Sequence, residues 1–275
     1  MEHLFEVGPD LRVDCRLSVG AVRVVAAPPG HARVELTAHG EVGEELLRRG
    51  EVKLYDDGGS RQRLVVHLPA RNLFSGLFSI TGRGGVTVTI HAPDGCELHA
   101  RTGAADVHAG LDLAAVDVVT GTGDVTLGDV AHDAAVKVAT GHVRVGTVGG
   151  ALDVDTAAGA VDAGAVQGPV RIRTASGAIA LGRTCDAVKV TAAAGDVGIA
   201  CAERGRVAVT ATTGDVTIGV PPGRRLHLDV SSTIGSIRSE LEETSATSDG
   251  GADLEIRVRA TTGDVDLRRA VSSAS

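Results

Sequence analysis

The chain has 275 residues and a formal net charge of −8 at pH 7, with 37 glycines but only three Phe, one Tyr and no Trp. Its lysines and arginines are dispersed without a basic run, which excludes a nucleic-acid groove. A compact globular core of this size normally uses aromatic side chains for bulk, whereas a narrow β-solenoid interior can be filled by Val, Ala, Leu and Ile. The glycines have no three-residue period, so they indicate turns and not a collagen helix.

We expect neither an export signal nor a membrane-spanning segment in this sequence. Its first 20 residues contain four acidic side chains and no apolar segment, so we expect no secretory signal. No stretch approaches the roughly 18 apolar residues of a transmembrane span. The cysteines, which have no metal-ligand spacing, are interpreted as small buried residues in a reducing cytosol: Cys15, Cys96, Cys185 and Cys201. We therefore expect a cytoplasmic protein.

The first 95 residues are β-rich but irregular. Apolar and polar residues alternate in five runs, which predict strands at 11–17, 22–24, 34–36, 61–68 and 86–90. Residues 41–50 favour one or two helical turns closed by Gly50. A solenoid needs a capping structure at its first coil that covers the unpaired backbone N–H and C=O groups of the edge strands. We interpret residues 1–95 as opening coils plus an N-terminal cap, continuous with the repeats, with a separate β domain as the alternative.

One segment between Pro69 and Gly85 departs from this pattern, because it holds two of the aromatic residues among Gly and Ser. Its candidate interaction residues are Leu73, Phe74, Leu77, Phe78 and Ile80. One interpretation is a loop that plugs an edge on the flank of the solenoid. The other is an exposed apolar patch for a partner or a membrane surface.

Residues 96–270 repeat one short pattern, and a polar tail follows at 271–275. The repeat is aligned on eight structural turn glycines: Gly123, Gly141, Gly159, Gly177, Gly195, Gly214, Gly235 and Gly263. The first four intervals are 18 residues, and the later ones are 19, 21 and 28, lengthened by 221–223 and 240–253. Self-similarity at this period predicts a solenoid.

The columns of the repeat define each coil. A β-branched residue stands two places after each glycine, as at Val125 and Val161, and the preceding arm has aliphatic residues at spacing two, as at Val170 and Ile172. This spacing places the side chains on one face of a strand. The pattern predicts a single all-β, parallel β-solenoid with coils of about 18 residues. We expect it to be right-handed, since parallel crossovers favour that hand.

Charged residues between the aliphatic columns predict the register. In a parallel stack, equivalent residues of neighbouring coils lie about 4.8 Å apart, so opposite charges become pairs. This predicts Asp117 beside Lys137, and it also places Asp155 beside Arg173 and Arg144 beside Asp162.

No pattern of residues indicates catalysis, a cofactor or a metal. An Asp follows five of the repeat anchors, but the calcium β-roll needs one in each nine-residue half, so we interpret these residues as structural. His91, His99 and His108 lack zinc-ligand spacing, and two of them belong to opposite arms of one coil. We expect a non-catalytic scaffold or binding protein without a cofactor.

Two alternatives remain open. A self-assembling, cytoskeleton-like β-helix protein would associate end to end, and the last coil at 265–269 would form one of its ends, with its arginines as the guard against such association. A carbohydrate-active β-helix enzyme would carry clustered acids on long loops, which are absent from the repeats.

The turns of the type Thr-x-x-Gly-Asp-Val resemble those of the putative-adhesin β-strand-repeat family, a bacterial domain of unknown function. They lie at 120–125, 174–179, 211–216 and 260–265, and the opening at 17–24 is also similar to that family. The resemblance implies a non-catalytic β-repeat protein, and its partner is expected to be an unknown protein or surface ligand.

Overall fold

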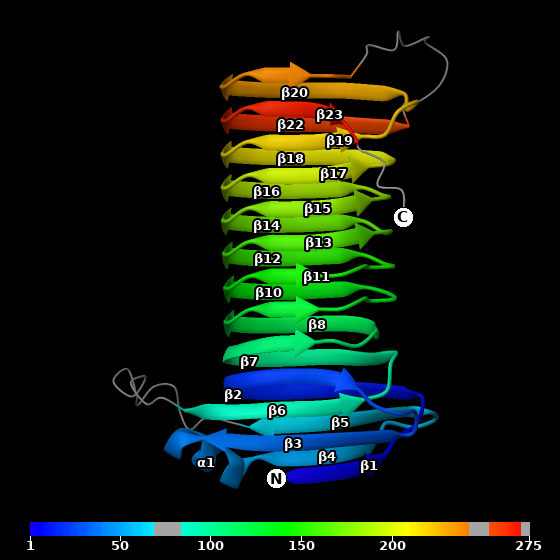
Figure 1. Ribbon diagram of the computed structural model, residues 1–275, viewed down its shortest axis with the longest axis vertical. Coiled ribbons are helices and arrows are strands. Elements are labelled where there is room, and N and C mark those ends of the chain that lie inside the picture. The colour runs from blue at the N-terminus through cyan, green and yellow to red at the C-terminus, as the bar shows by residue number, and fades with distance from the viewer. Residues whose placement is uncertain (69–83, 242–252, 271–275) are drawn as a thin grey trace. The chain divides into compact units, whose positions relative to one another are not determined.

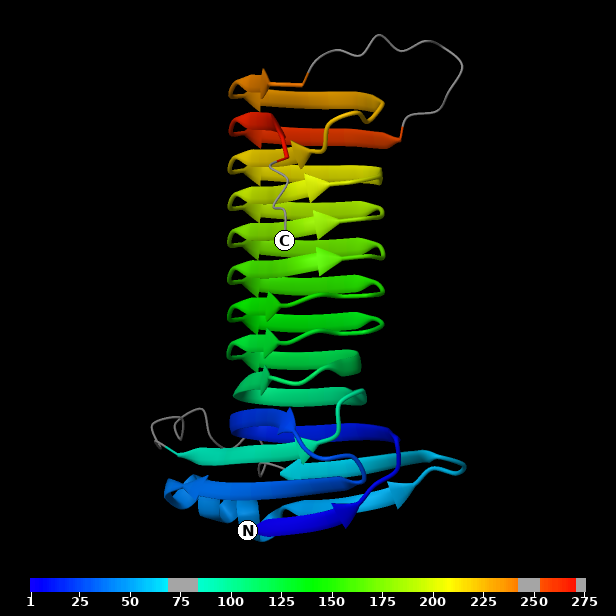
Figure 2. The ribbon, with the colours of Figure 1, turned by 45° about the vertical axis from the view of Figure 1, so that its right-hand side comes forward.

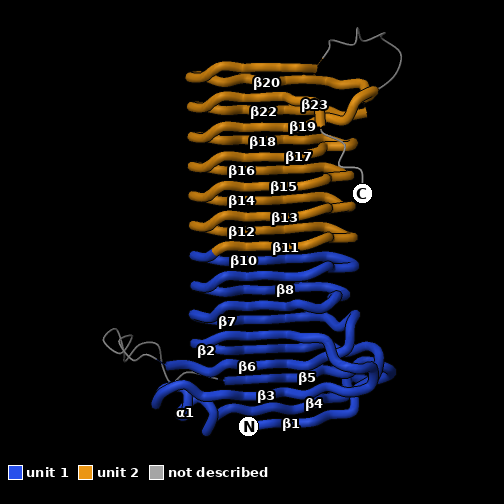
Figure 3. Tube along the Cα trace, in the orientation of Figure 1, with its two compact units in different colours: residues 1–141 blue, residues 142–275 orange. Residues whose placement is uncertain are grey.

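The computed structural model describes residues 1–68, 84–241 and 253–270, which form 23 strands and one helix (Figure 1). The chain divides into two compact units, residues 1–141 and 142–275 (Figure 3). Both units contain stacked parallel strands, which confirms the prediction of an all-β parallel solenoid. The candidate interaction loop from Leu73 to Ile80 lies outside the described residues, as does the tail at 271–275.

Unit 1 combines regular coils with an elaborated N-terminal part. Its elements are β1 (Glu2–Glu6), β2 (Asp10–Ala26), β3 (His31–His39), α1 (Gly40–Arg49), β4 (Glu51–Asp56), β5 (Arg61–Leu68), β6 (Gly85–Ala92), β7 (Cys96–Ala109), β8 (Leu113–Thr122), β9 (Val125–Leu127) and β10 (Ala134–Thr140). All five strand runs expected in this part are strands, whereas β1 and β4 were not anticipated. The expected short helix is α1, which ends before Gly50.

Strand β2 organises unit 1, because it pairs in parallel on both of its edges. On one side it pairs with β7 along both arms of a coil. On the other side its first arm pairs with β5 and its second arm with β6. The chain reverses outside this coil, where β3 pairs antiparallel with β6, β4 with β5, and β1 with β3. Strand β2 is therefore interior although it comes first among the coils.

Helix α1 connects β3 to β4 and packs on the sheet with one face. Its Leu46 is 4% exposed, and the helix contacts β3 and β6. Glu41 lies in its first turn, and Arg48 and Arg49 lie in its last, as the helix dipole favours. The helix thus covers apolar surface next to the antiparallel strands.

Unit 2 is a stack of coils, each made of two strands around a tight turn. Its elements are β11 (Val143–Val145), β12 (Leu152–Ala158), β13 (Val161–Val166), β14 (Val170–Ser176), β15 (Ile179–Thr184), β16 (Val188–Ala194), β17 (Val197–Ala202), β18 (Gly205–Thr213), β19 (Val216–Val220), β20 (Leu226–Ile234), β21 (Ile237–Ser239), β22 (Leu254–Thr262) and β23 (Val265–Arg269). Equivalent strands of successive coils pair in parallel at the 18-residue period, as in β12 with β14 and β14 with β16.

The predicted aliphatic columns form the core. Val161, Val190 and Ile199 are each 0–1% exposed, and their columns run through the stack without an aromatic residue. Alternate residues of the same strands face outward, as the burial pattern of β14 shows. Burial of apolar area at about 25 cal/mol per Å² is the main stabilising contribution in such a narrow interior.

The charge register is confirmed for two pairs and wrong for the third. Arg173 and Asp155 face each other at 3.4 Å, and Arg144 and Asp162 at 3.9 Å. Lys137, however, lies beside Val119 and not beside Asp117. The 18-residue register continues through β10, so Ala134 lies beside Val116, whereas the predicted pairing of Asp117 with Lys137 requires Val136 at that place. Alanine marks an aliphatic column less clearly than valine does. The alignment therefore placed the valine in the column and was displaced by two residues.

The order of the last coils differs from the order of the sequence. The coil β22–β23 pairs on one side with β18–β19 and on the other with β20–β21, so it lies between them. Figure 2 shows it in red between the yellow and orange coils. The expectation that Val265–Arg269 forms an end of the solenoid is therefore wrong. The coil with complete aliphatic columns takes the interior position, because a coil that is covered on both sides buries the most apolar surface and is stabilised most by that burial.

The turn glycines are required by the stacking. All eight have φ between 129° and 149°, a region that side chains with a Cβ rarely adopt. At Gly177 a Cβ would also overlap the backbone carbonyl of Gly159 in the coil beneath. Coils that stack at a strand spacing of about 4.8 Å leave no room for a side chain at this point.

Aspartates that follow the repeat anchors connect neighbouring turns. The Asp106 carboxylate accepts a hydrogen bond from the Asp124 amide at 2.9 Å, and the Asp196 carboxylate accepts one from the Asp215 amide at 2.9 Å. The ladder continues through Asp264, whose carboxylate accepts from the Ser236 amide at 2.8 Å. These carboxylates therefore satisfy backbone donors of the neighbouring coil.

The core assignment can be tested by placing a charge inside and removing one outside. Val161→Asp would leave an unpaired carboxylate in the interior and should lower the free energy of unfolding by about 3 kcal/mol or more. Asp162→Ser removes an exposed partner of Arg144 and should change it by less than about 1 kcal/mol. Urea denaturation followed by circular dichroism measures both. Equal losses would contradict the assigned faces.

The aspartate ladder predicts a pH dependence. The Ser236 amide and hydroxyl, together with Arg238, hold the pKa of Asp264 below its usual value. A depressed folded-state pKa contributes stability that is present above the unfolded pKa, near 3.9, and is lost as the pH falls through the folded pKa. Asp264→Asn keeps the acceptor oxygen but does not titrate. Its melting temperature should fall less steeply below pH 4 than that of the unmodified chain, and identical slopes would refute this role.

Candidate functional site

A polar surface of unit 1 covers four adjacent parallel strands, in the order β5, β2, β7 and β8. Alternate residues of a strand share a face, and register places them in rows across the sheet. The first row contains Arg63, Arg12 and Glu97. The second contains Asp14, His99 and Asp117, and the third contains Arg16 and Arg101. We call these eight residues the arginine grid.

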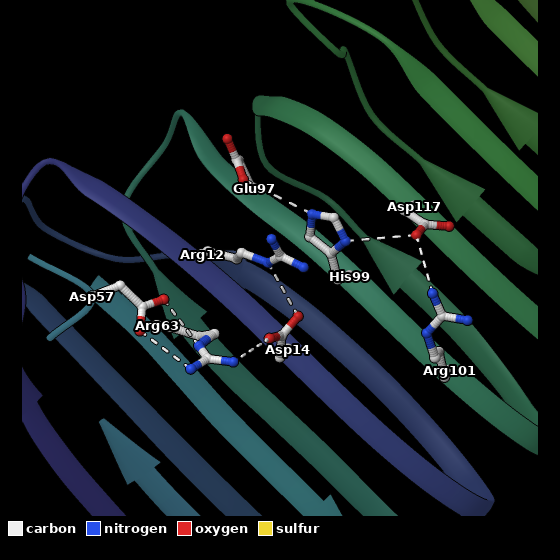
Figure 4. Close-up of polar contacts among 8 residues, drawn as sticks. All are labelled: Arg12, Asp14, Asp57, Arg63, Glu97, His99, Arg101 and Asp117. Atoms are coloured by element: carbon white, nitrogen blue, oxygen red, sulfur yellow. Dashed lines mark hydrogen bonds and ion pairs between the residues drawn. The ribbon is translucent and has the colours of Figure 1, made fainter. Parts of the chain in front are cut away.

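Ion pairs connect neighbouring members of the grid (Figure 4). Asp14 lies 3.2 Å from Arg12 and 3.8 Å from Arg63. Asp117 lies 3.5 Å from Arg101 and 3.7 Å from His99. The contacts run both along a strand and across it, so the side chains hold one another in place on a rigid sheet.

An aromatic residue borders the grid. The guanidinium of Arg63 lies 5.5 Å from the ring centroid of Tyr55, in cation–π range, and 3.0 Å from the Asp57 carboxylate. Tyr55 is 41% exposed and comes from β4, which pairs with β5. The border therefore offers an apolar ring face next to fixed charges.

Two depressions lie over these residues. One, of about 250 Å³, is lined by Arg12, Asp14, Cys15, Arg16, Arg63, His99, Arg101 and Asp117. The other, of about 400 Å³, lies where these strands begin, and Arg12 and Glu97 are among its walls. Arg12 lines both, so the two depressions adjoin.

The smaller depression has an excess of positive charge. Four guanidinium groups line it against two carboxylates, although the whole chain carries a net charge of −8. Arg16 is exposed and forms no ion pair with any residue of the described ranges. Guanidinium groups form bidentate hydrogen bonds with carboxylates, phosphates and sulfates. The chemistry of the depression therefore suits an anionic group.

The cysteine beneath the grid is not available for chemistry. Cys15 is 0% exposed, and burial, followed by the charge of Asp14, raises its pKa to about 12. A thiol with that pKa holds almost no thiolate at neutral pH, and the thiolate is the nucleophile. Cys15 thus contributes to the core.

Two of the histidines singled out in the sequence, His91 and His99, are part of the surface network. His91 lies 3.1 Å from the Arg33 guanidinium and 3.5 Å from the Glu35 carboxylate. His99 belongs to the grid and also lies 3.8 Å from Glu97. Within the ranges that the structure describes, no group of three or more His, Cys, Asp or Glu side chains is placed to hold a metal ion.

Sequence reasoning missed the grid, although its signal was present. Charged residues alternate with apolar ones at 12, 14 and 16 and again at 97, 99 and 101. What the sequence alone did not supply is that these two runs are neighbours across the sheet.

The helix of the described part is too short and too polar to cross a membrane.

The fold and this outer face define a parallel β-solenoid with a charged, shallow surface. The chain belongs to the Toastrack DUF4097 family, whose model matches residues 49–268. This membership confirms the resemblance to a strand-repeat family of adhesin-like proteins. A comparison with curated proteins gives no match.

A comparison with solved structures finds matches of low sequence identity. One is a putative cell adhesion protein from Clostridium sporogenes, with 12% identity, a TM-score of 0.29, and coverage of 98% of this chain and 99% of that one. Another is a putative adhesin from Bacteroides fragilis, with 9% identity, a TM-score of 0.34, and coverage of 97% and 96%. A third, from Parabacteroides distasonis, has 10% identity, a TM-score of 0.30, and coverage of 97% and 96%.

The burial of the thiols predicts their reactivity. In the native protein at pH 8, Cys15 and Cys96 should resist iodoacetamide, because burial raises the pKa of each to about 12. Cys201 is partly exposed and should react first. Peptide mapping by mass spectrometry, with urea-unfolded protein as the control, measures the order. Early alkylation of Cys15 would contradict the packing beneath the grid.

Proposed function

We propose that the protein is a non-catalytic binding scaffold, and that the arginine grid recognises a partner or surface ligand that carries anionic groups. The observation that carries this proposal is the excess of guanidinium groups in the smaller depression. The ligand would displace water from Arg16 and Arg101, the two exposed arginines of the third row.

The rigidity of the surface supports binding. Each strand of the grid is part of a parallel ladder, so its side chains project from a fixed backbone, and preorganised groups lose little entropy on binding. The regular rows suit a ligand with repeated charges, because successive strands present groups about 4.8 Å apart. Tyr55 at the border can pack against an apolar part of the same ligand.

Several features weigh against an enzyme. A general acid or base must be free to exchange a proton with a substrate. Here Asp14 and Asp117 are already held in ion pairs with Arg12 and Arg101. The nearby thiol is buried with a raised pKa. A carbohydrate-active enzyme would also need a pair of acids that face each other across a cleft.

Head-to-tail filaments need two complementary open ends, and the edge strands of unit 1 do not favour this. Strand β1 carries Glu2 and Glu6, and β4 carries Glu51 and Asp56, all of them exposed. Charged residues on edge strands oppose pairing with another chain. Binding through the outer face is therefore the function that these residues support best.

Binding can be measured with dextran sulfate as the probe and neutral dextran of equal length as the control. We expect the protein to bind only the sulfated polymer, with an affinity that falls as salt rises, since surface charges are screened. Arg16→Glu/Arg101→Glu should weaken binding by about tenfold or more. Arg144→Glu/Arg183→Glu changes the net charge equally at sites in unit 2 and should leave it within about threefold. Equal effects of the two double variants would refute the assignment to the grid.

A further inference from the structure

Unit 2 has one coil that is paired on a single side. Within the described residues, β20 pairs with β22 and β21 pairs with β23, and neither has a partner on its other edge. Figure 1 shows this coil as the outermost of the unit. The backbone N–H and C=O groups of an open edge are a template for another strand. We call this coil the end coil.

The end coil exposes aliphatic side chains that the repeat buries elsewhere. Leu228 is 40% exposed and Ile237 is 48% exposed, whereas their counterparts one coil inward, Ile256 and Val265, are 0% exposed. Ile234 is 65% exposed, and its counterpart in the next coil is Thr262. An aliphatic residue therefore stands here at a position where that coil has a hydroxyl. Contiguous exposed apolar residues mark interaction sites.

The charges of the end coil are few and already paired. The single carboxylate of its two strands, Asp229, lies 3.0 Å from Arg257 and 3.3 Å from Arg259. Its single guanidinium, Arg238, lies 3.9 Å from Asp264. Both pairs point back to the coil beneath. Two end coils that face each other would thus bring together surfaces without net charge.

The aspartate ladder also stops at this coil. Each inner turn from Asp196 through Asp264 presents a carboxylate to the next amide, whereas the end coil has Ser236 at that position. A carboxylate there would meet its own copy across a two-fold axis. The serine removes that repulsion, and its hydroxyl, which donates to the Asp264 carboxylate, can still accept a hydrogen bond.

We propose that two copies of the chain associate tail to tail through the end coil, with β20 and β21 continuing the ladder into the second copy. A second copy fits better than an unrelated peptide, because it presents the same strand spacing, the same aliphatic columns and no opposing charge. The contact is isologous, so assembly closes at a dimer. The edge strands of unit 1, with their exposed acids, take no part.

Sedimentation equilibrium of the full chain over a hundredfold range of concentration tests the proposal. We expect a monomer–dimer equilibrium without larger species. Ile237→Lys should weaken dimerisation by about tenfold or more, because two introduced cations would face each other. Leu4→Lys is the matched control: Leu4 is 73% exposed on the edge strand β1 of unit 1, so this change should leave the dimer intact.

A second variant separates association from folding. Ser236→Asp restores the residue that the inner turns carry, so its melting temperature should stay within about 2 °C of the parent, while its dimer should dissociate more readily, most strongly at low salt. A monomer at every concentration would overturn the proposal and leave the end coil to solvent or to a different chain. Loss of the dimer in Leu4→Lys, or growth beyond two copies, would overturn the tail-to-tail arrangement.

Discussion

The parallel backbone ladder between successive coils is the constraint on which the rest of the structure depends. Each coil supplies the hydrogen-bond partners of the next, so equivalent residues must recur at the same height and the same phase. The positive-φ glycines follow from it, because two turns at strand spacing leave no room for a Cβ. The aspartate ladder follows as well: where a turn carries an aspartate, its carboxylate accepts a hydrogen bond from the backbone N–H of the neighbouring turn.

The same constraint decides where function can reside. Among the described residues the interior is filled mainly by buried Val, Leu, Ile and Ala side chains, so the outer faces and the open edges are where a ligand can bind. On an outer face, parallel register converts a spacing of two along the chain into rows across the sheet. The arginine grid is such an array: Arg12, Asp14 and Arg16 of one strand meet Glu97, His99 and Arg101 of the next.

The solenoid could be predicted from the sequence because its signal is repeated in every coil, whereas single coils could not be placed with the same certainty. Ala134 is a small residue in an aliphatic column, and the stronger valines that follow shifted that coil by two places. The order of the last two coils could not be derived, since a parallel ladder is satisfied in either order. Ser236 and Ser239 depart from the repeat, but this departure did not identify their coil as the outer one. The grid needed the contact of β2 with β7, about which local patterns carry no information.

The intercalated coil has a mechanical consequence. A solenoid whose last coil lay outermost could be peeled strand by strand from that end, with one ladder broken at a time. Here a pull on the chain just beyond Arg269 acts on β23, which is held between β19 and β21, and both ladders must yield together. The coil most easily detached is instead β20–β21, which is tethered at both of its ends. An unfolding motor that engages the chain beyond β23 would therefore meet its greatest resistance at the first step.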